Sequence, residues 1–146
     1  MKIVMVFGAF DGLHPGHLDF FRQAKEHGDS LVVSVGRDTN VEKIKHKKTL
    51  FNEVERLDIV RELKIVDNAI LGAEDDFFQH VKQYAPDVIC LGYDQWASDA
   101  MVRRELDSVG LAKTVVVRLN PYDPLRAKST IMKEKSGEFR RFGDEK

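Results

Sequence analysis

The sequence predicts an α/β fold in which helices cover both faces of a parallel β-sheet. Short apolar runs rich in β-branched residues alternate along the chain with longer segments of helical periodicity, as in repeated strand–helix–strand units. The apolar runs are hydrophobic at nearly every position, which is typical of parallel strands buried on both faces. A chain of 146 residues can bury a substantial core but is too short for two domains of ordinary size, so we expect one domain.

Each expected element has its own local signal. The first strand, residues 2–7, is followed by a helix over residues 15–26, which begins at Pro15 because proline suits the first helical turn. Pro86 ends a later helix, since the residue before a proline disfavours helical backbone. The other expected strands span residues 30–35, 68–71, 87–91 and 114–119, and the other expected helices span residues 52–63, 75–84 and 98–109.

The helix over residues 52–63 carries a capping signal. Asn52 followed by Glu55 matches a capping box, in which two side chains satisfy backbone N–H groups reciprocally. Helical spacing predicts an inward face for this helix that consists of Val54, Leu57, Val60 and Leu63.

The turn between the first strand and the first helix concentrates glycine, aspartate and histidine. It reads Val6-Phe7-Gly8-Ala9-Phe10-Asp11-Gly12-Leu13-His14-Pro15-Gly16-His17. A helix start offers unpaired N–H groups and a partial positive charge, and His14 and His17 would share one face of the first helical turn. We interpret this turn as a polyphosphate-binding site. Capping and metal ligation are the alternatives, but no cysteine or further histidine lies nearby to complete a zinc site, so we predict no protein metal site.

The amino-acid composition limits the classes of partner that we expect for the protein. Lys and Arg number 23 against 24 Asp and Glu, for a net charge of −1, so no overall basic field favours nucleic acid and any phosphate affinity must be local. The single cysteine, Cys90, lies in an apolar run, which excludes an intrachain disulfide and indicates a buried thiol in a reducing compartment. The N-terminal apolar run ends at Phe10, well short of a membrane span. We expect a cytoplasmic protein without a membrane partner.

Residues 37–48 form a polar stretch with four lysines, one arginine and one histidine. Most such charge runs are solvated loops. The alternative is that the stretch overhangs the open edge of the sheet, where its cations would attract phosphates.

A second turn with functional residues, Gly92-Tyr93-Asp94-Gln95-Trp96, follows the expected fourth strand. Ligands of parallel sheets bind outside the carboxyl ends of the strands, where the first and fourth strands should be neighbours. Asp94 could accept hydrogen bonds from a ribose or an exocyclic amine, or orient a metal-bound water. Tyr93 and Trp96 could stack on a planar base or cover the edge of the core.

After the last strand, Ser129 and Thr130 would begin a final helix. A Ser-Thr helix start is ordinarily a cap, but Arg126 and Lys128 lie beside it, so we favour a second anion site for a triphosphate tail. The predicted domain covers residues 1–135, and residues 136–146 form a charged C-terminal tail.

The ordered set Gly-x-Phe-Asp-x-x-His-x-Gly-His after a buried strand closely resembles the signature of the cytidylyltransferase-like nucleotidyltransferases. The Gly-Tyr-Asp-Gln segment and the later Ser-Thr pair follow in the order expected for this family. The resemblance implies a Rossmann-like three-layer fold with five parallel strands in the order 3-2-1-4-5, and a homodimer. Ala9 departs from the family, because it stands where threonine or serine is usual and lacks a hydroxyl that could reach a phosphate.

Within the family, Leu-Gly-Tyr-Asp-Gln and the segment Arg118-Leu119-Asn120-Pro121-Tyr122 look most like the archaeal-type FAD synthases, which adenylylate FMN. This resemblance implies an ATP site with His14 and His17 as catalytic residues. It also implies a basic loop that meets the acceptor's phosphate, for which we take Lys43 and Lys45. The pair Glu55-Arg56 either resembles a Glu-Arg pair of the family or is a surface ion pair. The nucleotide-binding residues would be Ala9, Phe10, His14, Pro15, Gly16, His17, Asp94, Tyr122, Ser129 and Thr130.

Two other functions stay open. Glycerol-3-phosphate cytidylyltransferases, which form CDP-glycerol from CTP, are close relatives, and Trp96 fits them. A nucleotide-binding module without catalysis would explain Ala9, although the intact histidines argue against it. In a transferase, an acceptor phosphate with a second pKa of about 6 can attack the α-phosphate without a general base. Mg²⁺ carried by the nucleotide would help pyrophosphate to leave.

Overall fold

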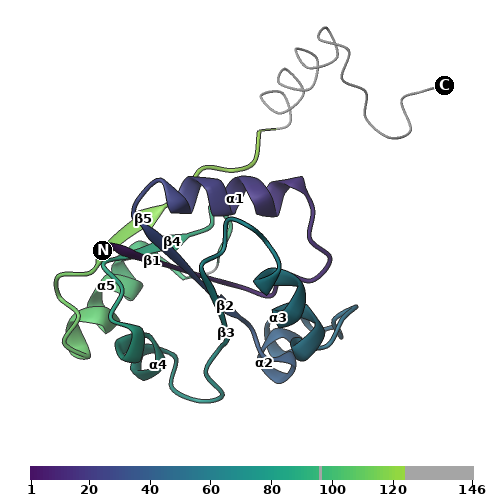
Figure 1. The fold of residues 1–146 in the computed structure, drawn as a ribbon. Helices are drawn as coiled ribbons and strands as arrows, with labels where there is room; N and C mark the ends of the chain where they lie inside the picture. Colours follow the sequence, from purple (N-terminus) through teal and green to yellow (C-terminus); the bar gives the residue numbers. More distant parts are fainter. Residues whose placement is uncertain (96, 124–146) are drawn as a thin grey trace, which may run out of the picture.

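Strands and helices alternate along the chain in the computed structural model, which describes residues 1–95 and 97–123 (Figure 1). The strands are β1 (Ile3–Gly8), β2 (Ser30–Val35), β3 (Asn68–Leu71), β4 (Val88–Leu91) and β5 (Val115–Arg118), and the helices are α1 (Pro15–Lys25), α2 (Asp38–Lys45), α3 (Glu53–Arg61), α4 (Phe77–Tyr84) and α5 (Asp99–Ser108). All strand pairs are parallel, in the order β3-β2-β1-β4-β5. The predicted Rossmann-like α/β fold and its strand order are confirmed.

The side chains of the sheet alternate between two apolar layers, as the pleat of a strand requires. Val4 and Val6 of β1 pack with α1 and α3, whereas Met5 between them packs with α4 and α5. On β4, Cys90 belongs to the first layer and Ile89 to the second. Cys90 is a buried free thiol, as predicted. Because helices cover both faces, the strands are apolar at nearly every position.

The carboxyl edge of the sheet has a switch point between β1 and β4. The chain passes from β1 to β2 on one side, and from β4 to β5 on the other. Such a reversal leaves a crevice beyond the carboxyl ends of the two strands. The turns that follow β1 and β4 meet there, because the side-chain amide of Gln95 donates to the carbonyl of Phe7 at 2.9 Å.

The helix α2 was not predicted. A solvated loop was one of the two predictions for residues 37–48, and Asp38–Lys45 are instead helical. Val41 is buried, and Asp38 offsets the partial positive charge at the helix start. Lys43 and Lys45 lie in the last turn, where their charge complements the helix dipole. One buried side chain in a short helix leaves too little periodicity to recognise in the sequence.

The start of α3 confirms the predicted capping box. The Asn52 side chain accepts from the Glu55 N–H at 2.9 Å, and the Glu55 carboxylate accepts from the Asn52 N–H at 3.0 Å. The predicted inward face is right for Leu57 and Val60 and wrong for Val54, which is 66% exposed. Arg56 is buried on the same face of α3 as Leu57 and Val60.

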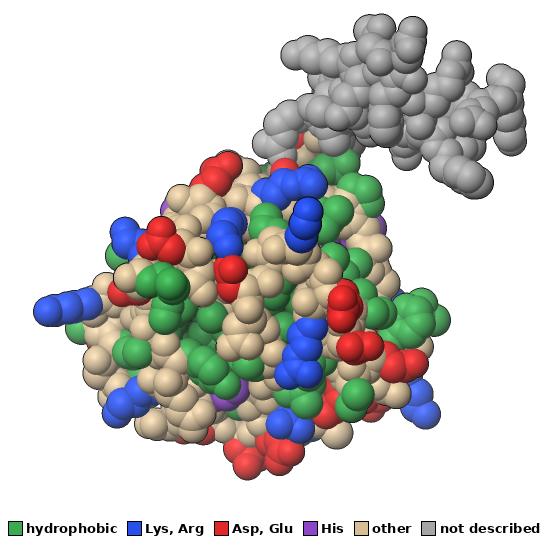
Figure 2. All heavy atoms as spheres, viewed as in Figure 1, with side chains coloured by type: hydrophobic (Ala, Val, Ile, Leu, Met, Phe, Trp, Pro, Cys, Tyr) green, Lys and Arg blue, Asp and Glu red, His purple; other side chains and the backbone are tan. Residues whose placement is uncertain are grey.

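Basic and acidic side chains are interspersed over the face drawn in Figure 2 rather than gathered in one patch. No helix within residues 1–95 and 97–123 is long and apolar enough to cross a membrane. The predicted charged tail, residues 136–146, lies outside the described residues.

Candidate active site

The β1–α1 turn holds its two histidines by reciprocal capping at the start of α1. The backbone N–H of Gly16 donates to Nδ1 of His14 at 3.0 Å, and the backbone N–H of His14 donates to Nδ1 of His17 at 3.2 Å. The two imidazole centroids are 3.9 Å apart. Since both Nδ1 atoms accept hydrogen bonds, the proton of each ring lies on Nε2, which is left to donate to a ligand. Capping and phosphate binding are therefore compatible roles for these histidines.

His17 is uncharged near neutral pH. Burial lowers its pKa most, and the neighbouring His14 and Lys45 lower it further, to about 4. The ring also packs edge-on against Phe10, with the centroids 5.8 Å apart. The His17 imidazole is thus a neutral donor, and the positive charge beside it comes from Lys45.

Ala9 and Phe10 form the bend of the turn. Phe10 has a left-handed backbone with a φ of 52°, and its ring is buried against Phe20 and Phe21 of α1. A Cβ atom on Gly8 would lie 2.7 Å from the tip of the Phe10 ring, so glycine is required beneath it. The Phe10 side chain belongs to the core, and its backbone is what it can offer to a nucleotide.

Arg56 of α3 is a fully buried cation beside the same turn. Its guanidinium donates to the carbonyl of Ala9 at 2.8 Å, to the carbonyl of Phe51 at 3.0 Å and to the carboxylate of Asp38 at 2.7 Å. The surface ion pair considered for Glu55-Arg56 is wrong, because Glu55 caps α3 and Arg56 is buried. One side chain therefore connects the histidine turn, the start of α2 and the segment before α3.

Asp38 and Glu53 join the starts of α2 and α3. The Asp38 carboxylate accepts from the Glu53 N–H at 3.2 Å, and the Glu53 carboxylate accepts from the Asp38 N–H at 3.0 Å. Burial raises the pKa of Asp38, but hydrogen bonds from Arg56 and the Glu53 N–H outweigh it and hold the pKa below its usual value. Asp38 is therefore an ionised partner for the Arg56 guanidinium.

Asp11 holds the segment that follows α2. Its carboxylate accepts from the Leu50 N–H at 2.6 Å and from the Phe51 N–H at 3.0 Å. Burial raises the pKa of Asp11, but these two hydrogen bonds, with Arg56 and Lys45, outweigh it and lower the pKa. The ionised carboxylate thus fixes the lysine-bearing segment beside the histidine turn.

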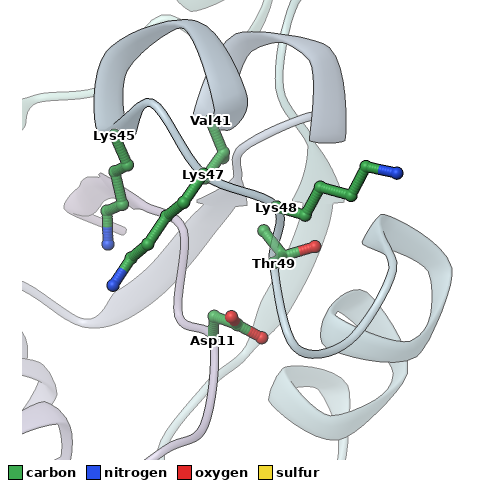
Figure 3. Close-up of a pocket in the computed structure, with 6 residues that line it drawn as sticks. All are labelled: Asp11, Val41, Lys45, Lys47, Lys48 and Thr49. Carbon is green, nitrogen blue, oxygen red and sulfur yellow. The ribbon is translucent and has the colours of Figure 1, made fainter.

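A pocket of about 130 Å³ lies between these segments (Figure 3). Its lining residues are Asp11, Val41, Lys45, Lys47, Lys48 and Thr49. In Figure 3 the side chains of Lys45 and Lys47 extend in the same direction, whereas that of Lys48 extends away from them. Of the two lysines predicted to meet the acceptor, Lys45 lines the pocket and Lys43 does not. A small hollow among several ammonium groups suits a phosphate group.

Arg118, the last residue of β5, holds the turn after β4. Its guanidinium donates to the carbonyls of Gly92 and Ala97 at 2.6 Å each, and it pairs with Asp99 of α5 at 2.7 Å. The end of the neighbouring strand therefore sets the shape of the second predicted functional turn.

The tip of this second turn is open to solvent. The Gln95 side-chain carbonyl accepts from the Gly92 N–H at 2.7 Å, which closes the turn on itself. Tyr93 and Asp94 are exposed at its tip. Trp96 lies outside the described residues.

Tyr122 lies against the start of α1, because a Cβ atom on Gly16 would be 3.7 Å from the Tyr122 Cβ. Asp94 follows β4, the neighbour of β1 in the sheet. Ser129 and Thr130 lie outside the described residues. At one edge of the sheet, the structure brings together the predicted residues Ala9, Phe10, His14, Pro15, Gly16, His17, Asp94 and Tyr122.

The supporting roles of Arg56 and Asp38 were missed from the sequence. Arg56 lies four residues before Val60, on the face that α3 buries, and that spacing is the signal that could have found it. Asp38 has no such signal, because Glu53 and Arg56 lie 15 and 18 residues further along the chain.

Comparison with known proteins identifies the family. The family model described as cytidylyltransferase-like matches residues 5–137, and the chain belongs to this family, as its motifs predicted. Together with the curated relatives, this match indicates that the chain is a nucleotidyltransferase.

The curated relatives include FAD synthases. The chain is 43% identical to the FAD synthase of Thermoplasma acidophilum over 135 residues, which are 92% of this chain and 94% of the relative. It is 45% identical to the FAD synthase of Methanosarcina mazei over 133 residues, which are 90% of this chain and 86% of the relative.

Solved structures share the fold. A Thermoplasma volcanium protein described as a lipopolysaccharide core biosynthesis protein matches with a TM-score of 0.80 and 41% identity, over 84% of this chain and 99% of that one. A pantoate-beta-alanine ligase of Francisella tularensis matches with a TM-score of 0.52 and 14% identity, over 93% of this chain and 69% of that one. The second likeness concerns the fold alone.

Replacing Arg56 should destabilise the protein. In Arg56→Met, the carbonyls of Ala9 and Phe51 and the carboxylate of Asp38 lose a buried donor, which should lower the free energy of unfolding by about 2–4 kcal/mol. Urea unfolding near neutral pH measures this loss. Arg22→Met, at an exposed position of α1, is the control and should change stability by less than about 0.5 kcal/mol. Equal stability of the two variants would contradict the role assigned to Arg56.

His17 should stay neutral well into the acid range. Its pKa of about 4 predicts an NMR titration midpoint near that value in the ligand-free protein, with the proton on Nε2 at neutral pH. The unfolded chain would bind a proton near the ordinary pKa of 6.5, so His17 should cost stability as the pH falls from 6.5 to about 4. His17→Gln assigns the signal. A midpoint near 6.5 would contradict the buried, neutral state.

Proposed function

We propose that this protein is an FAD synthase, which transfers the adenylyl group of ATP to FMN and releases pyrophosphate. The observation that carries the proposal is a histidine pair with a neutral His17 next to a lysine-lined pocket. Lys45 lines the pocket and lowers the pKa of both His17 and Asp11. Relatives named FAD synthase at 42% to 48% identity support the choice of ATP and FMN.

The reaction requires alignment more than acid–base chemistry. The FMN phosphate has a second pKa of about 6, so near neutral pH it is largely a dianion that can attack the α-phosphorus of ATP without a general base. One phosphate oxygen forms the new P–O bond. The bond between the α-phosphorus and its bridging oxygen to the β-phosphorus breaks, and pyrophosphate leaves with that oxygen and the electron pair.

On the nucleotide side, the Nε2–H groups of His14 and His17 would donate to phosphoryl oxygens as charge develops, which makes them the proposed catalytic residues. The N–H groups at the start of α1 would bind the same phosphates. Ala9 lacks a hydroxyl but keeps its backbone N–H. The proposed nucleotide-binding residues are Ala9, Phe10, His14, Pro15, Gly16, His17, Asp94, Tyr122, Ser129 and Thr130.

Mg²⁺ would enter with the triphosphate. In the part of the chain that the structure describes, no three His, Cys, Asp or Glu side chains are grouped to hold a metal ion. Mg²⁺ suits this setting, because it commonly keeps several waters and binds through substrate phosphates with few protein ligands.

On the acceptor side, the lysine pocket would take the phosphate of FMN. Lys45 lines the pocket, and Lys43 would act at longer range from the same last turn of α2. Arg56 and Asp11 hold the pocket in place, and Asp11 does so through the Leu50 and Phe51 N–H groups that its carboxylate accepts from. A homodimer remains our prediction for the assembly.

Product analysis tests the proposal. With Mg²⁺, ATP and FMN should give FAD and pyrophosphate, identified by mass, whereas CTP with glycerol 3-phosphate should give no CDP-glycerol. His14→Ala and His17→Ala should fold normally and turn over roughly 10²-fold more slowly, since a preorganised donor is worth about 3 kcal/mol. Formation of CDP-glycerol without FAD would contradict the assignment of FMN as the acceptor. Absence of any product would favour a nucleotide-binding module without catalysis.

The two lysines predicted to meet the acceptor should differ in their effect on the KM for FMN. Lys45→Ala should raise the KM for FMN roughly tenfold, because it removes a charge from the pocket, with little change in the KM for ATP. Lys43→Ala is the matched control from the same helical turn and should have a smaller effect. If the KM for ATP rises instead, the pocket serves the nucleotide and not the acceptor.

A further inference from the structure

We infer that Gln23, on α1, is a positioning residue for the nucleotide site, and this inference rests on the proposed function. Gln23 does not belong to any of the motifs that define the family resemblance. Its side-chain amide nevertheless holds the chain just after β5, which then reaches the histidine turn.

Gln23 makes a two-point contact with the backbone of Asn120. Its Nε2 donates to the Asn120 carbonyl at 3.0 Å, and its Oε1 accepts from the Asn120 N–H at 2.9 Å. The same Nε2 donates to the carboxylate of Asp19 at 2.9 Å. Because a carboxylate only accepts, Asp19 determines which end of the amide is the donor. The amide thus pairs with both backbone polar groups of Asn120, as a neighbouring strand would.

The contact directs the following residues along α1 toward its first turn. Leu119 packs in the core with Phe21 of α1, and Tyr122 lies against Gly16. From Gln23 back to Gly16 is two turns of helix, or roughly 10 Å along the axis. Figure 1 shows the segment after β5 running beside α1 in this way. Gln23 therefore sets where Tyr122 meets the turn that carries the histidines.

An amide is the side chain that this position needs. Glutamate at the same position would still accept from the Asn120 N–H but would place a carboxylate against the Asn120 carbonyl and the Asp19 carboxylate. Both neighbours favour the protonated acid, whose single O–H can donate to the Asn120 carbonyl while its other oxygen accepts from the Asn120 N–H. Lowering the pH should therefore restore the contact in Gln23→Glu. A general loss of folding would not be restored by acid.

The test is ATP affinity, measured by titration calorimetry of the full chain with Mg²⁺ and without FMN. At pH 8, Gln23→Glu should bind ATP roughly tenfold more weakly than the wild type, the loss expected from one or two hydrogen bonds. At about pH 5.5 the difference should shrink, because the new carboxyl group begins to protonate. Gln79→Glu, at an exposed position of α4, is the matched control and should follow the wild type at both pH values.

Gln23→Met, which keeps the length of the side chain and removes all three hydrogen bonds of the amide, should weaken ATP binding at both pH values. In the FAD assay, both variants should raise the KM for ATP and leave the KM for FMN unchanged.

Wild-type ATP affinity in Gln23→Met and Gln23→Glu, or equal losses for ATP and FMN, would overturn the inference. If the wild type binds ATP but forms no FAD, the acceptor assignment fails while the affinity comparison still decides the role of Gln23. A wild type that does not bind ATP would overturn both.

Discussion

The buried guanidinium of Arg56 is the interaction on which the geometry of the site depends. It donates to the carbonyl of Ala9 in the histidine turn, to the carbonyl of Phe51 before α3 and to the carboxylate of Asp38 at the start of α2. A buried charge is tolerated when it is paired and its donors are satisfied. The three segments that meet at Arg56 cannot move apart without leaving buried polar groups unpaired, so the nucleotide turn and the lysine pocket hold one relative position.

The positive charge at the carboxyl edge of the sheet comes from a few neighbouring side chains and not from the net charge of the protein. The chain as a whole carries a net charge of −1, yet Lys45, Lys47 and Lys48 gather at one small pocket. His17 beside them is neutral, because burial, the neighbouring His14 and Lys45 lower its pKa. The site therefore combines cationic side chains, which attract an anionic substrate, with histidine donors held by the backbone, which can align it.

Side chains from distant elements shape both turns at the switch point. Asp11 fixes the segment after α2, and Arg118 and Gln95 close the turn after β4. Gln95 also joins that turn to the carbonyl of Phe7 at the end of β1. Loops that carry function are commonly mobile unless such contacts hold them. Here the hydrogen bonds place two turns, far apart in the sequence, at one crevice.

The order of the strands in the sheet was implied by the family resemblance. The amino-acid sequence by itself determined the strands, most helices and the histidine turn. Those features are local, because apolar runs, capping residues and the Gly-x-Phe-Asp-x-x-His-x-Gly-His pattern lie within short segments of chain. Only the tertiary structure decided that residues 38–45 form a helix, that Val54 is exposed and that Arg56 is buried. The partners of Arg56 include Ala9, 47 residues away, and Asp38, 18 residues away. The spacing of Arg56 from Val60 indicates a buried position. The groups that Arg56 contacts have no local pattern, because distant segments bring them together only once the chain has folded.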